Sequence, residues 1–348
     1  MIEIVGSQYQ YQGEKLSCSE IIFVQDHHYN ENLQEFLIKK LLENSVCNPM
    51  DHTLIFDHVL QHDDILKSYK CIFLPLFLAQ TTSDFLKQNI IIDWDNKMTC
   101  FNFMINKPRL HREFLLQLID YFSISNYKYT LCWRKNEINR QHMYRLTLSE
   151  LYKKIILETE ISIVPKQFLL GQENLLDRGL QYKHIKNSEN YQAFLQKEVF
   201  EPTCISLITE PAFFERETII TEKTIMAVYG GTIPVWVGGW RIADYMRDQG
   251  FDVFDDIVDH SYQDLTDPWD RCYYAIERNV NLLRDFDTVQ KFVYNNKHRL
   301  QANLELLESN TFVNNIQQIV KQQPEKIKKE LESKINRGVF FNTHICES

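Results

Sequence analysis

The sequence predicts an α/β fold built on parallel sheets, and three observations predict it. Short apolar runs typical of buried strands alternate along the chain with segments that have helical spacing. The chain has 348 residues, a length that favours about two domains. Its 44% hydrophobic and 24% charged residues are close to the averages of soluble globular proteins, which excludes a wholly disordered chain.

Strand-like runs in the first part of the chain alternate with one amphipathic segment. Residues 30–44 have helical spacing, with one apolar face made by Leu33, Phe36, Leu37 and Leu41. The strand-like apolar runs lie at 21–25, 53–56, 71–78 and 89–92. Because the polar turn 93–97 closes this part, we expect an N-terminal α/β domain over residues 1–97.

The second part of the chain repeats the alternation over a longer stretch. Strands are predicted at 98–105, 127–133, 204–209 and 232–237. Helices are predicted at 111–121, 221–230, 241–249 and 269–286. We therefore expect a second domain over residues 98–320, followed by a charged helical tail over 321–348.

Charge, cysteine spacing and hydropathy exclude several function classes. Lys and Arg number 38 and Asp and Glu 47, so 38 − 47 gives a net charge of −9 and no overall footprint for nucleic acid. The 8 cysteines include no Cys-x-x-Cys pair, which predicts buried free thiols. The first residues lack the pattern of a signal peptide, and no apolar run reaches the roughly 18–20 residues of a membrane span. We expect a soluble, cytoplasmic protein without a transmembrane segment.

The segment 205–259 carries the clearest chemical signal. A buried strand ends at Thr209-Glu210, and a loop leads to a helix that opens with Thr221, Glu222 and Lys223. Thr221 is suited to the N-cap position, and Glu222 lies where the helix dipole favours an anion. Lys223 is unfavourable there unless an anion lies between it and the helix, and a diphosphate would meet this condition.

A second basic segment follows the strand predicted at 98–105. Lys107, Arg109, His111 and Arg112 lie at the exit of that strand and the start of the next helix. Basic side chains that face a helix N-terminus are also explained most simply by a bound anion. The two segments together favour an anion-binding site at one edge of a parallel sheet.

The order of these pieces resembles a known donor-binding motif. Residues 220–223 read Ile-Thr-Glu-Lys, and residues 227–238 read Ala-Val-Tyr-Gly-Gly-Thr-Ile-Pro-Val-Trp-Val-Gly. With Glu210 before them, they resemble the motif of the α1,3-fucosyltransferases, mainly over residues 98–290. The resemblance implies a GT-B-like fold, in which two Rossmann-like domains face each other across a cleft. Residues 1–97 would form the acceptor side, and residues 98–320 would form the domain that binds the donor nucleotide sugar. It also implies a GDP-fucose donor, inversion at the anomeric carbon, a glycan or other hydroxyl acceptor, and no essential metal.

The resemblance assigns roles to individual residues of this chain. Lys223 and Arg112 would hold the departing diphosphate, with Arg109 as the second match for the arginine, and Glu222 would accept a ribose hydroxyl. The expected donor-binding residues are Lys107, Arg109, Arg112, Glu210, Thr221, Glu222 and Lys223. The chain has Pro211 and Ile219 where the family has Asn and Tyr, which leaves other nucleotide sugars open as donors.

Inverting transfer requires a carboxylate that takes the proton from the acceptor hydroxyl. In the resembling family this base lies in the N-terminal domain, just after a strand. Asp57 directly follows the run 53–56, and Asp26 directly follows the run 21–25. Both remain candidates for the catalytic base.

Two further functions remain open at the level of sequence. Asp93-Trp94-Asp95 has the form of an Asp-x-Asp motif, which in a metal-dependent GT-A transferase would bind a divalent cation and a diphosphate. Asp285-Phe286-Asp287 has the same form within a helical context. A non-catalytic protein that binds a nucleotide sugar or a carbohydrate is the third possibility.

Overall fold

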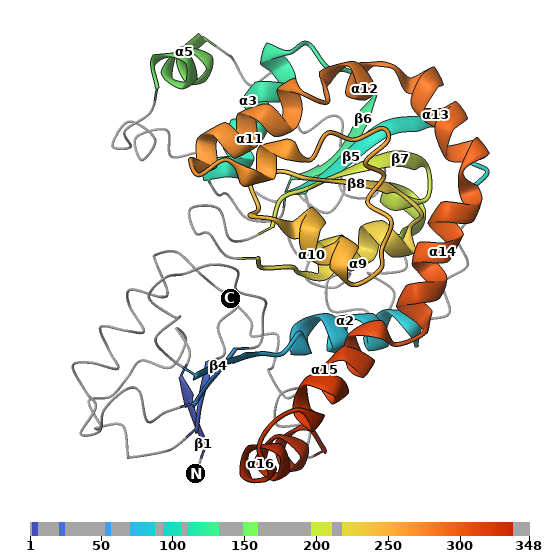
Figure 1. The fold of residues 1–348 in the computed structure, drawn as a ribbon. Helices are drawn as coiled ribbons and strands as arrows, with labels where there is room; N and C mark the ends of the chain where they lie inside the picture. The colour runs from blue at the N-terminus through green and yellow to red at the C-terminus, as the bar shows by residue number, and fades with distance from the viewer. Residues whose placement is uncertain are drawn as a thin grey trace, which may run out of the picture.

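A computed structural model describes residues 2–5, 21–24, 53–56, 70–87, 93–105, 110–131, 149–158, 196–210 and 218–336. Within these residues the chain forms two separate four-stranded sheets, and every pair of neighbouring strands is parallel. Parallel strands that alternate with helices agree with the α/β class predicted from the sequence. Figure 1 shows the two sheets apart from each other, with helices on both faces of the second.

The strands of the first sheet follow one another in chain order. They are β1 (Ile2–Val5), β2 (Ile21–Val24), β3 (Thr53–Phe56) and β4 (Lys70–Phe73). The strands predicted at 21–25 and 53–56 are confirmed, while the predicted helix 30–44 and strand 89–92 lie outside the described residues. The apolar run 71–78 divides at Pro75, which stands at the N-cap of a helix.

The second sheet has the strand order β6-β5-β7-β8. Its strands are β5 (Thr99–Ile105), β6 (Tyr127–Leu131), β7 (Thr203–Ile208) and β8 (Ile233–Trp236). All residues of the two central strands, β5 and β7, are buried. Burial on both faces explains why these strands are continuous apolar runs rather than alternating ones.

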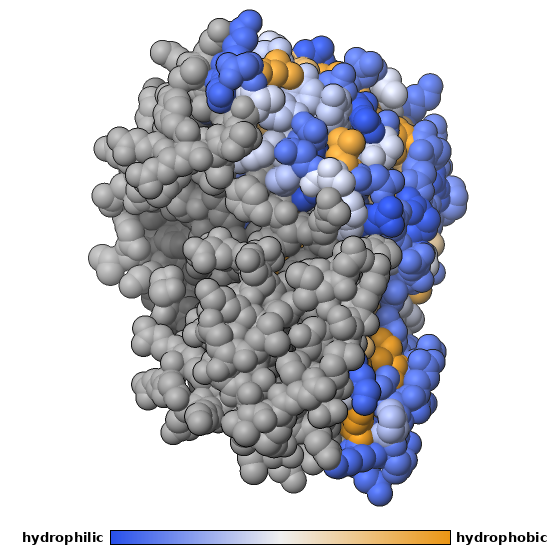
Figure 2. All heavy atoms as spheres, turned by 60° about the vertical axis from the view of Figure 1, so that its left-hand side comes forward, coloured by the Kyte–Doolittle hydropathy of each residue, from blue (hydrophilic) through white to orange (hydrophobic). Residues whose placement is uncertain are grey.

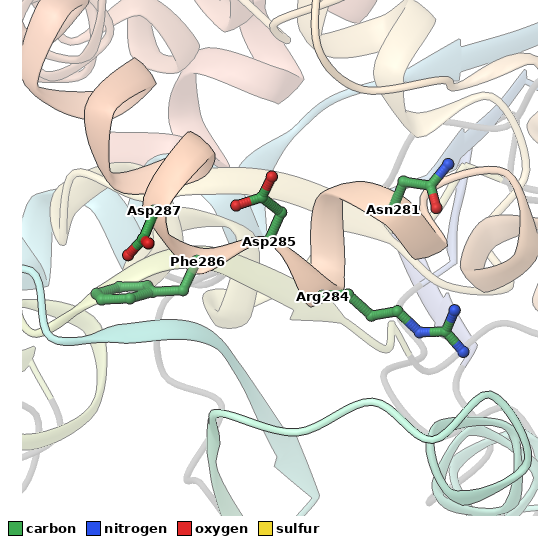
Figure 3. Close-up of a pocket in the computed structure, with 5 residues that line it drawn as sticks. All are labelled: Asn281, Arg284, Asp285, Phe286 and Asp287. Atoms are coloured by element: carbon green, nitrogen blue, oxygen red, sulfur yellow. The ribbon is translucent and has the colours of Figure 1, made fainter.

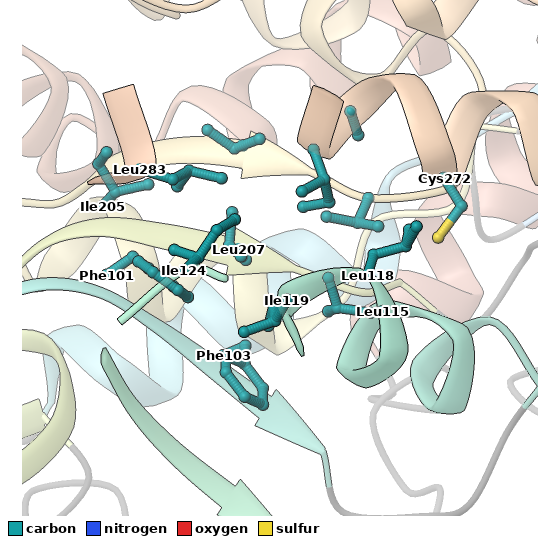
Figure 4. Close-up of a cluster of buried hydrophobic side chains, with 14 of the residues drawn as sticks. Phe101, Phe103, Leu115, Leu118, Ile119, Ile124, Ile205, Leu207, Cys272 and Leu283 are labelled. Atoms are coloured by element: carbon teal, nitrogen blue, oxygen red, sulfur yellow. The ribbon is translucent and has the colours of Figure 1, made fainter. Parts of the chain in front are cut away.

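Side chains from the two faces of this sheet enter two different cores. Phe101 and Phe103 of β5 pack into the cluster shared with α3 (Leu110–Tyr121) and α11 (Pro268–Glu277), drawn in Figure 4. Met104 points to the other face and joins the cluster of α9 (Glu222–Tyr229) and α10 (Ile242–Asp248). The remaining elements are α2 (Leu76–Leu86), α5 (Glu150–Glu158), η5 (Gln196–Phe200), η6 (Ser261–Asp264), α12 (Val280–Arg284), α13 (Phe286–Asn295), α14 (Lys297–Glu308), α15 (Thr311–Lys321) and α16 (Glu325–Asn336).

The prediction of one long helix over 269–286 is wrong, because the segment forms two helices. The first, α11, ends at Glu277, and α12 begins at Val280. Between them lies Asn279, whose side-chain Nδ2 donates to the backbone carbonyls of Ala275 and Asp259. Its side-chain Oδ1 accepts from the backbone N–H of Asp259 at 2.9 Å. The buried Asn279 thus stabilises the end of α11 against the 259–260 loop, a long-range contact that helical spacing does not reveal.

The helix α2 packs on the second sheet's helices although it precedes the domain boundary predicted near residue 97. Phe85 of α2 is fully buried, and its ring centroid lies 6.0 Å from that of Tyr229 in α9. The same core includes Leu307 of α14, Phe312 of α15 and Leu331 of α16. Figure 1 shows α14 and α15 running from the second sheet past α2, so the C-terminal helices and α2 form one packed group.

The described surface carries apolar residues singly. The large exposed hydrophobic residues among the described ones are Met98, Tyr121, Leu151 and Tyr294. Figure 2 shows a mainly hydrophilic described face with scattered apolar residues. None of the helices in the described ranges combines the length and the apolar character that crossing a bilayer requires.

We expect Phe85→Ala to lower the free energy of unfolding by about 3–5 kcal/mol, because it removes a fully buried aromatic side chain from the contact between α2 and α9. Urea unfolding followed by circular dichroism measures the change. Leu151→Ala, at a residue 41% exposed on α5, is the control and should change the value by less than about 0.5 kcal/mol. A Phe85→Ala effect as small as that of the control would contradict the packing of α2 on α9.

Candidate functional site

The candidate site lies where the parallel strands of the second sheet end. β5, β7 and β8 have their carboxyl ends at one edge, and ligands of α/β proteins bind beyond this edge. Thr209 and Glu210 follow β7 there, and α9 begins beside them, because the Glu210 carboxylate bonds to Thr221. Arg112 of α3 reaches the same place and donates to the Thr209 carbonyl at 3.2 Å.

The Glu210 carboxylate is the centre of a buried hydrogen-bond network. One oxygen, Oε1, accepts from the Thr221 amide at 3.0 Å and from the Thr224 hydroxyl at 2.7 Å, and the Thr221 hydroxyl donates to Oε2 at 2.5 Å. Thr221 occupies the predicted N-cap position, but its side chain makes no capping hydrogen bond to the helix. A carboxylate from the end of β7 therefore stabilises the start of α9.

The network continues from Thr224 to the end of β8. The indole Nε1 of the fully buried Trp236 donates to the Thr224 hydroxyl at 2.9 Å, and the Tyr262 hydroxyl donates to the Trp236 carbonyl at 2.7 Å. Thr224 and Trp236 lie in the segment that the sequence singled out, but neither was predicted to have a role in the site. The threonine two residues after Glu222 was the available signal, since a polar residue in the first turn of a helix often contacts the preceding loop.

Burial affects the pKa of the Glu210 carboxyl. Its side chain is 1% exposed, and removal from water raises the pKa of its carboxyl above the ordinary value, although the nearby Lys223 and the hydrogen bonds from Thr221 act in the opposite direction. The Glu210 carboxylate accepts hydrogen bonds from Thr221 and Thr224, at the start of α9. Glu210 is accordingly placed to position the amino end of α9.

Lys223 and Glu222 form an ion pair at the amino end of α9. The Lys223 ammonium donates to Glu222 Oε1 at 2.6 Å and to the Thr221 hydroxyl at 3.3 Å. The Lys223 side chain is 11% exposed and that of Glu222 is 38% exposed. Burial disfavours the charged Glu222 carboxylate, but attraction to Lys223 and hydrogen bonds outweigh this effect and lower its pKa. The Glu222 carboxylate thus supplies an anion beside Lys223, a cation that the helix dipole would otherwise disfavour at this position.

The two described residues of the basic segment are held against the backbone of the β7 exit. Arg112 is 4% exposed and His111 is 3% exposed. The His111 ring lies with Nε2 at 3.1 Å from the Glu210 carbonyl, while Arg112 bonds to the Thr209 carbonyl. Their described contacts position the residues that follow β7. Lys107, Arg109, Asp26 and Asp57 lie outside the described residues.

Arg271 fixes the turn that follows β8, and sequence analysis did not single it out. Its fully buried guanidinium donates to the carbonyls of Gly238, Leu265 and Thr266, and lies 5.4 Å from the Trp240 ring centroid. The Trp240 carbonyl in turn accepts from the Thr218 hydroxyl at 2.9 Å, just before α9. Gly238 has a φ of +90°, which favours glycine in this turn. No local pattern connects an arginine in α11 with this turn.

The two Asp-x-Asp triplets lie away from this edge. Asp93 and Asp95 precede β5, at the opposite, amino end of the strands; Asp95 pairs with Lys297, and Asp93 accepts from the Asp95 amide at 2.9 Å. Asp285 caps α13 by accepting from Thr288, and Asp287 points in another direction beside a shallow hollow (Figure 3). Within the described ranges, no three or more His, Cys, Asp or Glu side chains gather as metal ligands.

No family model, curated protein or solved structure matches this chain.

We expect Glu210→Gln to change the pH dependence of stability. The pKa of the folded carboxyl is raised, so between the unfolded value, about 4.3, and the folded value the folded chain keeps a proton that the unfolded chain releases. The free energy of unfolding of the wild type should therefore fall with rising pH, relative to that of Glu210→Gln, and level off once the folded carboxyl is ionised.

Urea unfolding of both proteins from pH 4 to pH 8 measures this difference (about the range over which such a group titrates). The exposed Glu332→Gln is the control for loss of one carboxylate. A difference between wild type and Glu210→Gln that rises with pH would show that burial does not dominate at Glu210.

Proposed function

We propose that this protein is an inverting glycosyltransferase that uses a nucleotide diphosphate sugar and no essential metal ion. The observation that carries the proposal is the Lys223 ammonium at the amino end of α9, beside the exit of β7. A cation and the positive end of the helix dipole together suit a diphosphate. The alternation of parallel strands and helices, in two sheets, supports the choice of a GT-B-like architecture.

Binding of the diphosphate would displace Glu222 from Lys223. The Glu222 side chain is 38% exposed and that of Lys223 is 11% exposed, so the carboxylate has the freer path into solvent. Once released, Glu222 would accept a hydroxyl of the donor ribose, as the resemblance to α1,3-fucosyltransferases implies. Glu210 and Arg112 would keep the strand exits and the helix start in place during this exchange.

In the transfer step, a carboxylate of the enzyme takes the proton of the acceptor hydroxyl while its oxygen attacks the anomeric carbon from the side opposite the leaving group. The bond between the anomeric carbon and the diphosphate breaks, and Lys223 with the α9 N–H groups stabilises the negative charge that develops there. Asp57 and Asp26 are the proposed bases. GDP-fucose is the first donor to test, with a glycan or another hydroxyl compound as the acceptor.

A non-catalytic nucleotide-sugar-binding protein is the second candidate. The favouring observation is that the two carboxylates described at this edge are engaged, Glu210 by Thr221 and Thr224, and Glu222 by Lys223. Neither is placed as a base in this arrangement. A metal-dependent transferase that uses Asp93 and Asp95 fits less well, because both precede β5 and Asp95 pairs with Lys297.

We expect Lys223→Gln to weaken binding of GDP about 10- to 100-fold. A hydrogen bond to a charged group contributes about 1.5–3 kcal/mol, and about 1.4 kcal/mol corresponds to a tenfold change in affinity. Isothermal titration calorimetry measures the affinity for GDP. Parallel titrations with UDP and ADP show which nucleobase the site prefers. Binding of UDP but not GDP would overturn the donor proposed here and leave the site in place.

Lys153→Gln is the matched control, because Lys153 also pairs with a neighbouring glutamate, Glu150, at 2.7 Å, but lies on α5. Its affinity for the nucleotide should equal that of the wild type. Equal affinities of wild type and Lys223→Gln, with folding unchanged in both, would exclude Lys223 from the nucleotide site.

We expect Asp57→Asn or Asp26→Asn to lower the rate of sugar transfer by about 10²–10⁴-fold, the usual contribution of a general base, while nucleotide affinity stays unchanged. Transfer is measured with GDP-fucose and a glycan acceptor, in the presence and absence of a chelator. Wild-type rates in both variants would exclude both aspartates as the base. Nucleotide binding without transfer or donor hydrolysis in the wild type would favour the binding protein instead.

A further inference from the structure

Two buried cysteines lie side by side at the amino ends of the central strands. Cys100 is on β5 and Cys204 on β7; the neighbouring pairs, Thr99 with Thr203 and Phe101 with Ile205, place them opposite each other. Both are free thiols and both side chains are 0% exposed. The pair is unrelated to the proposed nucleotide site, which lies at the carboxyl ends of the same strands.

The strand register places the Cα atoms of the two residues within the range that disulfides join. Neighbouring strands lie about 4.7–4.9 Å apart, and disulfides join residues whose Cα atoms are about 4.4–6.8 Å apart. Directly opposite residues of parallel strands also point to the same face of the sheet. In the present state the Cys100 thiol donates to the carbonyls of Leu283 at 3.4 Å and Leu282 at 3.7 Å.

We propose that Cys100 and Cys204 are an oxidation site, which a hydroperoxide converts into an intramolecular disulfide. One thiolate attacks the peroxide, forming a sulfenic acid and releasing water or an alcohol after protonation. The second thiol then attacks the sulfenic sulfur, forming the S–S bond and releasing water. Two thiols are oxidised by two electrons, and one hydroperoxide is reduced.

The Lys97 side chain interacts electrostatically with Cys204. Burial raises the pKa of Cys204 to about 11, and attraction to Lys97 acts against this rise. Burial and the nearby Cys204 raise the pKa of Cys100 to about 12. Lys97 is itself 1% exposed, and its ammonium donates to the Gly230 carbonyl at 3.3 Å. Because burial raises both pKa values, both thiols stay protonated in the closed structure, and attack on a peroxide requires that the structure opens. In the opened structure attraction to Lys97 favours Cys204 as the attacking thiol, with Cys100 as the resolving one.

Access to the pair requires a small opening of the structure. The cover over Cys100 includes α12, a helix of only 5 residues. Short elements with few contacts open locally at low free energy, and hydrogen peroxide is close to water in size. Formation of the disulfide removes the Cys100 thiol from the carbonyls of Leu282 and Leu283, so oxidation also loosens α12.

The experiment treats the folded, full-length chain with a series of hydrogen peroxide concentrations. Catalase stops the reaction, N-ethylmaleimide blocks remaining thiols in denaturant, and non-reducing peptide mass spectrometry maps the products. The expected result is one peptide that links Cys100 to Cys204 and has two hydrogens fewer than its reduced parts. Cys272, which is also 0% exposed but donates to the His111 carbonyl, should remain a thiol and serves as the internal control.

Cys204→Ser and Cys100→Ser test the mechanism. In Cys204→Ser, Cys100 should stay available to N-ethylmaleimide, whereas in Cys100→Ser, Cys204 should convert to the sulfenic acid and higher acids. Hydrogen exchange of the oxidised wild type should show faster exchange over residues 280–284. The proposal is overturned if Cys100 and Cys204 of the wild type remain thiols to the same extent as Cys272, or if oxidation links other cysteines. Neither outcome depends on whether the protein transfers sugars.

Discussion

The arrangement of the candidate site depends on one buried carboxylate. Glu210 leaves the end of β7 and accepts hydrogen bonds from the amide and hydroxyl of Thr221 and from the hydroxyl of Thr224. A buried charge is costly unless such donors surround it. The same bonds join the central strand of the sheet to the first turn of α9, and through Thr224 they reach Trp236 at the end of β8. Three elements are therefore fixed around one side chain.

The hydrogen bonds of Glu210 also affect how the charged side chains around the start of α9 pair with one another. Two glutamates lie near Lys223. The buried Glu210 accepts its hydrogen bonds from Thr221 and Thr224, whereas the partly exposed Glu222 forms the ion pair with Lys223. In the proposed function, an incoming diphosphate would compete with the partly exposed Glu222 carboxylate, while the hydrogen bonds of Glu210 stay in place. Arg112 and Arg271 take part in the scaffold, since both donate to carbonyls at strand exits and both are buried. The cations Arg112 and Arg271 thus stabilise the strand exits, whereas Lys223 pairs with the partly exposed Glu222.

The fold class and most strands of the second sheet were predictable from local pattern. Buried parallel strands give continuous apolar runs, and the runs 98–105, 204–209 and 232–237 became β5, β7 and β8. The predicted start of α9 at Thr221 was confirmed as well. The long helix over 269–286 was not, because Asn279 bonds to Asp259 across a distant loop. Contacts of this kind have no periodicity along the chain.

The sequence by itself determined most strands of the second sheet, the net charge of −9 and the concentration of acidic, basic and hydroxyl side chains in residues 205–259. Those properties follow from residue spacing and composition, which act over a few turns or one strand. Only the tertiary structure decided that Glu210 caps α9, that Arg112 and Arg271 hold strand exits, and that Cys100 lies beside Cys204. Each of these depends on which strands become neighbours, because the parallel order β5-β7-β8 joins segments far apart in the chain.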